Sequence, residues 1–348
     1  MITFVRWLLF PFTLLYASIV WFRNRLFDVG WIKSTSFDIP VVIIGNLAVG
    51  GTGKSPMTEY ILRILNNAVS VAVLSRGYGR KTKGFRWVKV SNNATEVGDE
   101  PLQIKRKFPD TPVAVCEDRV FAVKQLEKNH HAVLLDDAFQ HRALRPSYSI
   151  LLFDYQSLLG PIIPLPTGNF RDLLKESRRA DIIVVTKCPN NIDPISLLHI
   201  KTRLEKHTAA TIFYANITYM PIRNGAGEII SADQLSKMDV LAVTGIANPS
   251  PMLRFLEPKV RQLKHISFPD HHSFSTADLQ RIDQTFVQID SEHKMIVTTE
   301  KDYQRLPESF LKKLPIYILP IEQRVLFGQS EQFEQLIKQA FERYRSVN

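Results

Sequence analysis

The stretch VVIIGNLAVGGTGKSP, residues 41–56, decides the fold that we predict for this chain. Its four β-branched residues predict a buried strand, a glycine-rich turn follows, and Pro56 suits the first turn of a helix. In such a turn backbone N–H groups point at phosphate oxygens, a lysine reaches the β- and γ-phosphates, and a hydroxyl ligates Mg²⁺. The expected nucleotide-binding residues are Ala48, Val49, Gly50, Gly51, Thr52, Gly53, Lys54 and Ser55. Because Ala48 replaces the usual first glycine, a chance glycine-rich turn is the alternative.

Paired acids follow another predicted strand, residues 132–136, which ends in Asp136 and is followed by Asp137. A phosphate-binding turn needs a metal-organising acid at the end of a neighbouring strand, so either residue is expected to hold Mg²⁺ directly or through water. Taken alone, two acids at a strand end more often mark a turn or a helix cap. Their combination with Lys54 and Ser55 favours the metal site.

Apolar runs alternate with helical stretches along the chain, which is typical of a parallel sheet covered by helices on both faces. The predicted strands are residues 41–45, 71–75, 113–116, 132–136, 149–153, 181–186, 240–244, 263–267, 294–299 and 316–319. We expect an α/β protein of the P-loop NTPase type, doubly wound and mostly parallel, with a smaller C-terminal α/β unit and an N-terminal apolar helix. The expected divisions are residues 1–37 (helix and linker), 38–220 (P-loop core), 221–239 (a connecting β-ribbon) and 240–348 (the smaller unit, ending in an amphipathic helix at 331–344).

The N-terminal segment, residues 7–22, is an uncharged and largely apolar run flanked by arginines. As a helix it would rise ~24 Å at ~1.5 Å per residue, short of the ~30 Å hydrocarbon core of a bilayer. It lacks a small-residue cleavage motif, and tryptophans suited to the headgroup region stand at Trp7, Trp21 and Trp31. We therefore predict a helix that lies on or half inside a membrane surface. A buried core helix and a cleaved signal peptide are the alternatives.

The chain has 348 residues, of which 45% are hydrophobic, and a formal net charge of +10 with a pI near 9.5. Its basic character favours an anionic partner, either a nucleic acid, an anionic lipid or a phosphorylated substrate. No zinc-finger spacing or aromatic-plus-basic RNA-binding motif is found, so we do not expect a nucleic-acid partner. Only two cysteines occur, Cys116 and Cys188, both within apolar runs, which argues against a disulfide framework.

Further motifs are spread over almost the whole chain. They lie at residues 45–56, 74–80, 97–101, 118–119, 135–141, 166–172, 179–181, 186–187, 245–249, 268–272 and 299–302. Together they resemble the tetraacyldisaccharide 4'-kinases (lipid A 4'-kinases) of Gram-negative bacteria. That family's phosphate-binding loop often lacks the first glycine, so Ala48 is no objection. Two departures are mild, since Ala138 replaces a more usual glycine and Asp172 a more usual glutamate.

The resemblance implies ATP-dependent, Mg²⁺-dependent phosphorylation of the 4'-hydroxyl of tetraacyldisaccharide 1-phosphate, a lipid A precursor, to give lipid IVA. It implies a lipid substrate, contact with a membrane surface and a place at the cytoplasmic face of the bacterial inner membrane, peripheral or monotopic through the N-terminal helix. A lipid substrate would also explain why an apolar segment precedes a kinase core.

The resemblance also implies roles for residues that the sequence alone leaves ambiguous. It favours Asp99 paired with His271 as the catalytic base, and it adds Glu100 to Ser55 and the paired acids around Mg²⁺. In isolation Asp99 would be a solvated loop acid and His271 part of a turn before a helix. The expected substrate- or phosphate-binding residues are Arg76, Tyr78, Arg119, His141 and Arg171, with their individual roles open. A solvated basic loop at 76–83 and a structural hydrogen bond at His141 are the alternatives.

The main rival is a membrane-associated P-loop GTPase or ATPase that acts as a targeting or assembly switch. A GTPase usually carries an Asn-Lys-x-Asp motif that reads the base. Residues 186–189 are Thr-Lys-Cys-Pro and lack both the Asn and the Asp. Lys187 and Lys301 stand near strand ends, where they would border the nucleotide or cap turns, and we leave them outside the catalytic set.

Overall fold

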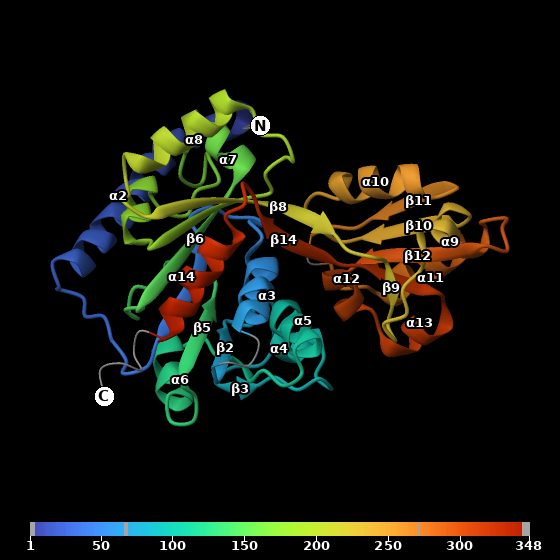
Figure 1. Ribbon diagram of the computed structural model, residues 1–348, viewed down its shortest axis with the longest axis horizontal. Helices are drawn as coiled ribbons and strands as arrows, with labels where there is room; N and C mark the ends of the chain where they lie inside the picture. Colours follow the sequence, from blue (N-terminus) through green and yellow to red (C-terminus); the bar gives the residue numbers. More distant parts are fainter. Residues whose placement is uncertain (1–3, 66–68, 271, 343–348) are drawn as a thin grey trace.

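The computed structural model describes residues 4–65, 69–270 and 272–342 and shows two sheets in two units that lie side by side (Figure 1). Within these residues the larger sheet has nine strands in the order β14-β8-β7-β6-β1-β5-β2-β4-β3. They are β1 Val41–Asn46, β2 Val71–Ser75, β3 Arg86–Trp87, β4 Val113–Val115, β5 Ala132–Asp136, β6 Tyr148–Asp154, β7 Ile182–Thr186, β8 Thr211–Tyr219 and β14 Ile321–Val325. Only the edge strands β3 and β14 pair antiparallel, which confirms the predicted mostly parallel sheet.

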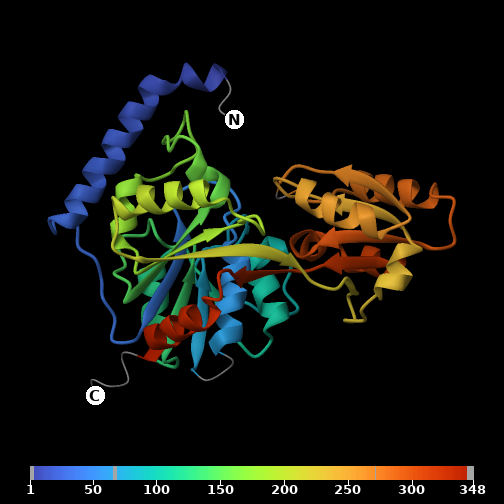
Figure 2. The same cartoon turned by 45° about the horizontal axis from the view of Figure 1, so that its top comes forward.

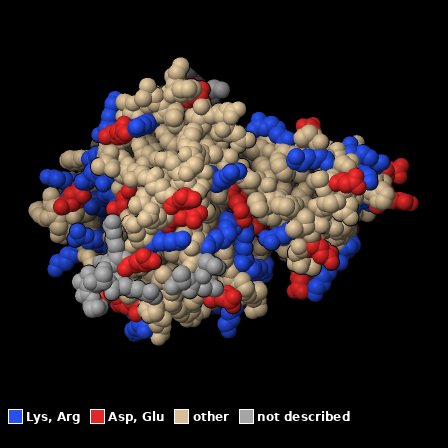
Figure 3. All heavy atoms as spheres, viewed as in Figure 1, with Lys and Arg blue, Asp and Glu red and all other residues tan. Residues whose placement is uncertain are grey.

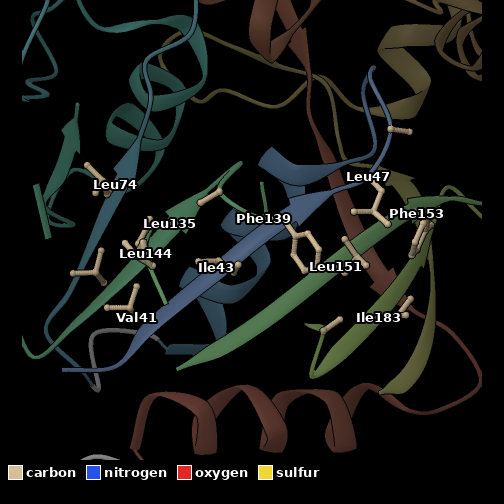
Figure 4. Packing of buried hydrophobic residues seen from close by; sticks show 14 of the residues in the cluster. Val41, Ile43, Leu47, Leu74, Leu135, Phe139, Leu144, Leu151, Phe153 and Ile183 are labelled. Atoms are coloured by element: carbon tan, nitrogen blue, oxygen red, sulfur yellow. The ribbon is translucent and has the colours of Figure 1, made fainter. Parts of the chain in front are cut away.

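Helices cover both faces of the larger sheet, because alternate residues of each central strand point to opposite sides. Val42 and Ile44 of β1 pack toward α3 Lys54–Leu65, α4 Ala94–Val97, α5 Asp99–Lys107 and α14 Ser330–Glu342. Val41 and Ile43 pack toward α6 Arg119–Leu126, α7 Tyr155–Leu159 and α8 Pro194–Glu205. Figure 4 shows Val41 and Ile43 among the buried side chains of this cluster. This two-sided burial explains why residues 41–44 of β1 form an unbroken apolar run, and it places the end of the strand deep in the molecule.

The smaller sheet has five strands among the described residues, in the order β11-β10-β12-β13-β9. They are β9 Arg223–Asn224, β10 Asp239–Thr244, β11 Gln262–Ser267, β12 Lys294–Thr299 and β13 Ile316–Leu319. The helices of this unit are α9 Ala232–Ser236, α10 Ser250–Leu256, η2 Glu257–Lys259, α11 Thr276–Val287, α12 Glu300–Arg305 and α13 Glu308–Lys313. The antiparallel pair β8 and β14 forms the connection between the two units (Figure 1).

The end of the chain lies elsewhere than the predicted division placed it. Residues 321–342, expected in the smaller unit, return to the larger sheet, where β14 pairs with β8 and α14 packs beside α3. Phe333, Ile337 and Phe341 fill the core on that side. An amphipathic pattern indicates that a helix packs, but it does not indicate against which sheet. Likewise β9, within the expected connector, joins the smaller sheet.

The N-terminal segment forms two helices, α1 Phe4–Trp7 and α2 Phe10–Asp28, which confirms the predicted N-terminal helix. In both views α2 lies along the outside of the larger unit, on the side away from the smaller one (Figures 1 and 2). It is followed by an extended segment that leads into β1 at the centre of the sheet.

Candidate functional site

The glycine-rich loop connects β1 to α3 and is shaped by residues of β7 and of the edge strand β14. Gly53 has a φ of 82°, and a Cβ there would come within 2.5 Å of Nε2 of Gln323. The Gln323 amide donates a hydrogen bond to the Gly53 carbonyl oxygen at 3.0 Å, and the Thr186 hydroxyl donates to the Thr52 carbonyl at 2.8 Å. Glycine is required because it adopts positive φ without a Cβ clash. β7 and β14 thus fix the loop that β1 begins.

The start of the loop is held from the other side by residues 169–171. Ala48 forms a β-bridge with Phe170, and the Val49 N–H donates to the Asn169 carbonyl at 2.8 Å. The Val49 amide, expected in the phosphate cradle, is therefore used within the protein. Gly50 and Gly51 are exposed, so the loop between them and Lys54 is the part open to a phosphate.

The predicted metal-organising acids meet beside Ser55. The Ser55 hydroxyl donates to Glu100 Oε1 at 3.0 Å. Asp136, at the end of β5, is 1% exposed, and neither of its carboxylate oxygens has a hydrogen-bond partner among the described residues. Desolvation, followed by the Glu100 charge, raises the pKa of Asp136 to about 7. A buried carboxylate without a partner calls for a cation.

Asp137 is the second acid, and it lies between two cations. The Lys54 ammonium nitrogen is 3.8 Å from Asp137 Oδ2, and the Arg171 guanidinium donates to the Asp137 carboxylate and to Asn46 Oδ1. Desolvation acts to raise the pKa of Asp137, but Lys54 and Arg171 outweigh it and hold the pKa below its ordinary value. The two neighbouring acids therefore differ, since Asp137 is neutralised by the protein and Asp136 is not.

These residues fit Mg²⁺ bound together with a nucleotide. In the described part of the chain no group of three or more His, Cys, Asp or Glu side chains is arranged as a metal cage. Mg²⁺ in phosphoryl-transfer sites instead takes a hydroxyl and one or two carboxylates, with water and phosphate oxygens completing its shell. Ser55, Glu100 and the unpartnered Asp136 carboxylate provide oxygen ligands of this kind.

Asp99, the proposed base, begins α5 next to Glu100 and is 6% exposed. One oxygen accepts the Glu100 N–H at 3.0 Å, and the carboxylate forms an ion pair with Arg305. Arg305 also donates to Asp302 Oδ1 at 3.1 Å. His271, expected to pair with Asp99, lies outside the described residues.

Sequence reasoning did not place two cations at this site, since Lys301 was left outside the catalytic set and Arg305 was not considered. Lys301 forms an ion pair with Glu100, and Arg305 pairs with Asp99, and both cations come from α12 of the smaller unit. Desolvation acts to raise the pKa of Glu100, but the Lys301 ammonium holds it below its ordinary value. The motif at 299–302 was the available signal, but sequence does not show which acids α12 reaches in the other unit.

The remaining predicted residues surround the acids on the side of β2 and α6. Arg119 is 8% exposed, and its pKa is lowered by desolvation and by the neighbouring Arg76. His141 Nε2 is buried without a hydrogen-bond partner among the described residues, and desolvation and Arg119 lower the His141 pKa. Tyr78, in the turn after β2, is 69% exposed. The structure thus gathers Arg76, Arg119, His141 and Arg171 near the paired acids, with Tyr78 at the surface.

A central parallel strand that leads through a glycine-rich loop to Lys54 and Ser55, beside buried acids at the ends of neighbouring elements, defines a P-loop phosphotransferase of the NTPase type. The family described as tetraacyldisaccharide-1-P 4'-kinase matches residues 5–342. This chain belongs to that family, which confirms the resemblance seen in the motifs.

Individual relatives support the same assignment over nearly their full length. A tetraacyldisaccharide 4'-kinase from Bacteroides thetaiotaomicron is 42% identical over 350 residues, covering 95% of this chain and 92% of the relative. One from Flavobacterium johnsoniae is 43% identical over 321 residues, covering 91% and 92%. A crystal structure of the "apo" form of LpxK from Aquifex aeolicus in complex with ATP matches with a TM-score of 0.76 at 30% identity, covering 97% of this chain and 99% of that one.

Proposed function

We propose that this chain transfers the γ-phosphoryl group of ATP to the 4'-hydroxyl of tetraacyldisaccharide 1-phosphate, giving lipid IVA. The observation that carries the proposal is the convergence of Lys54, Ser55, Glu100 and Asp136 at one end of the larger sheet, with Asp99 beside them. The relatives are named as tetraacyldisaccharide 4'-kinases, and the related crystal structure holds ATP. The names of the relatives support the lipid acceptor, and the arrangement of the glycine-rich loop and the acids supports the binding site for ATP, the phosphoryl donor.

The protein's part in the reaction is mostly positioning and charge neutralisation. Lys54 and the loop amides from Gly50 onward hold the β- and γ-phosphates. Ser55, Glu100 and Asp136 would hold Mg²⁺, which when bound would neutralise charge on the phosphate oxygens. Arg171 forms an ion pair with Asp137, so the negative charge of Asp137 does not repel the phosphates of the nucleotide.

The acceptor hydroxyl must lose its proton as its oxygen bonds to the γ-phosphorus and the bond from that phosphorus to the bridging oxygen of ADP breaks. Asp99 takes that proton, because it is the acid next to the metal-holding Glu100 and is nearly buried. Arg305 fixes the carboxylate from the other unit. We assign Arg76, Arg119 and His141, which lie near the paired acids, to binding phosphate oxygens, with their individual roles open.

Helix α2 supports the membrane part of the proposal, because its exposure pattern is the reverse of an ordinary surface helix. Apolar side chains of α2 at helical spacing are more than half exposed, namely Phe12, Leu15, Ile19 and Phe22. The residues of α2 that are buried are polar, Thr13 and Asn24. A large exposed apolar face of this kind marks a contact surface. We assign it to the bilayer that contains the lipid substrate, at the cytoplasmic face of the inner membrane.

The mode of contact is interfacial. Within the described part of the chain, none of the helices combines the length and the hydropathy that a membrane crossing requires. In the view of Figure 3, Lys and Arg side chains lie on both units, interspersed with acidic ones, and the whole chain has a net charge of +10. A basic surplus draws a protein to anionic lipid, and an amphipathic helix then enters the headgroup region.

The deciding experiment is incubation with labelled ATP, Mg²⁺ and the disaccharide 1-phosphate lipid. We expect a bisphosphorylated lipid from the wild-type protein and a strongly reduced yield from Lys54→Ala. ATP hydrolysis without any lipid product would defeat the assignment and favour the switch-type NTPase.

Substitutions that introduce a charge into the exposed apolar face of α2 are expected to release the protein from membranes. Phe12→Glu and Ile19→Glu should each weaken binding to anionic vesicles more than about tenfold, because each removes a large apolar side chain from the lipid contact. Affinity for ATP should stay unchanged. The matched control is Ile229→Glu, which changes an isoleucine 63% exposed in the smaller unit. Equal vesicle binding by all variants in a flotation assay would exclude α2 as the contact.

A further inference from the structure

The segment 163–172, which we call the strap, lies between α2 and the glycine-rich loop. On the loop side, the Arg171 N–H donates to the Leu47 carbonyl at 2.8 Å, and the Asn169 carbonyl accepts the Val49 N–H at the same distance. The Arg171 side chain reaches Asn46 and Asp137. The strap therefore fixes the first residues of the loop and one of the paired acids.

The strap has little regular structure of its own. It folds into a tight turn in which the Gly168 N–H donates to the Pro164 carbonyl at 2.8 Å and the Leu165 N–H donates to the Phe170 carbonyl at 2.8 Å. A Cβ at position 168 would lie 1.8 Å from the Ile163 carbonyl oxygen. The remaining polar groups of an irregular segment must find partners elsewhere if they are buried.

Those partners come from the polar face of α2. The Thr13 hydroxyl donates to Thr167 Oγ1 at 2.8 Å and accepts the Thr167 N–H at 3.1 Å, and both residues are almost completely buried. The Tyr16 hydroxyl donates to the Arg171 carbonyl at 2.9 Å. Further along the helix, the Asn24 amide donates to Asp172 Oδ1 at 2.9 Å, again in a buried position.

Just before α2, Arg6 extends the same contact. Its guanidinium donates to the carbonyls of Pro166 and Gly168, at 3.2 and 2.9 Å, and to Asn169 Oδ1 at 3.0 Å. The strap is thus held along its length, from residue 166 to residue 172, by one side of the N-terminal helices. Removing these partners would leave buried polar groups of the strap unsatisfied, which costs more than the loss of an exposed hydrogen bond.

We propose that Thr13, Tyr16 and Asn24 are positioning residues for the ATP site, acting through the strap on the glycine-rich loop. The helix that presents an apolar face to the membrane then also shapes the phosphate-binding loop. The inference rests on the ATP-binding part of the proposed function and does not depend on the identity of the acceptor lipid.

The test uses the full chain and measures Mg²⁺-ATP affinity and vesicle binding separately, without the acceptor lipid. Thr13→Val removes the hydroxyl and keeps the shape, and Thr13→Ser keeps the hydroxyl. Tyr16→Phe removes only the hydroxyl that reaches Arg171. The control is Ser18→Ala on the same helix, where the hydroxyl is exposed and bonds only to the Leu14 carbonyl of its own helix in the described contacts.

We expect Thr13→Val and Tyr16→Phe each to weaken ATP binding about threefold to tenfold, the effect of one lost partly buried hydrogen bond. Vesicle binding should stay at the wild-type level. Thr13→Ser and Ser18→Ala should bind ATP like the wild type. If Thr13→Val fails to fold in a thermal scan, Tyr16→Phe decides the question alone.

Wild-type ATP affinity in a folded Tyr16→Phe variant would overturn the proposal, and so would a loss of ATP affinity that appears only together with a loss of vesicle binding. Absence of lipid phosphorylation by the wild type would instead refute the proposed function. The two failures are therefore distinguishable.

Discussion

Replacing Asp136 with asparagine is expected to stabilise the nucleotide-free protein and to remove most of its activity. The carboxylate is buried without a hydrogen-bond partner among the described residues, and its pKa is raised from 3.8 to about 7. A raised pKa means that ionising the Asp136 carboxyl costs more free energy in the folded protein than in the unfolded chain. At pH 8 the penalty is on the order of a few kcal/mol, which asparagine, uncharged and of similar shape, avoids.

The stability difference between Asp136→Asn and the wild type is expected to depend on pH in a defined direction. Below pH 3.8 the acid is protonated in both states and costs nothing. Between pH 3.8 and 7 only the unfolded chain ionises, so wild-type stability falls as the pH rises, and above pH 7 the penalty is constant. The stability gain of Asp136→Asn, measured by urea unfolding without metal or nucleotide, should therefore grow from pH 5 to pH 8.

Activity should move in the opposite direction. If Asp136 holds Mg²⁺ as proposed, its loss removes an oxygen ligand from the ion that would neutralise the phosphate charge in the transition state, and turnover should fall by about 10²- to 10³-fold. Asp110→Asn, which removes an equal charge from an exposed loop, is the matched control and should change neither quantity. A variant less stable than the wild type at pH 8 would show that the Asp136 carboxylate has a structural partner.

The positions in the fold that sequence predicted well are those that follow from local order along the chain. The strand at 41–46, the loop and the helix that starts at Lys54 follow one another directly, and Asp136 stands at the end of a neighbouring apolar strand. The carboxyl ends of parallel strands lie at the same edge of a sheet, so residues that follow those ends lie close together. For these residues the predicted position in the fold agrees with the observed one.

The residues that sequence missed act across long separations. Gln323 fixes Gly53 from β14, and Lys301 and Arg305 reach acids near residue 100 from the other unit. Lys301 lies in a recognisable motif, but no local pattern names the partner of any of the three, because that partner depends on how the two sheets and the returning strand β14 pack. The apolar run at the N-terminus was predicted, but its polar inner face was not. That face consists of single polar residues such as Thr13 and Asn24. Their role cannot be predicted without knowing that the strap, which is distant in sequence, packs against them.

Asp99→Asn is expected to lower turnover by about 10²- to 10⁴-fold while leaving ATP affinity within about threefold of the wild type, as the loss of a general base predicts. Asparagine keeps the shape of the side chain at the start of α5 and can still accept the Glu100 N–H. It cannot take a proton from the acceptor hydroxyl. The measurement is single-turnover lipid phosphorylation at saturating ATP, alongside an equilibrium titration with Mg²⁺-ATP.

The variant also breaks the ion pair with Arg305, so a control must separate that loss from the loss of the base. Arg305→Gln removes the same ion pair and keeps Asp99, and it should retain much more turnover than Asp99→Asn because the proton acceptor is still present. Lys301→Met breaks the neighbouring ion pair with Glu100 and tests whether that pair supports Mg²⁺ binding. It should weaken Mg²⁺-ATP binding or lower turnover, by an amount that depends on the Mg²⁺ concentration. If Arg305→Gln and Asp99→Asn lose equal activity, the ion pair between the two units is what matters. If Asp99→Asn loses turnover and ATP affinity to the same degree, Asp99 belongs to the nucleotide site and the proton acceptor must be sought elsewhere.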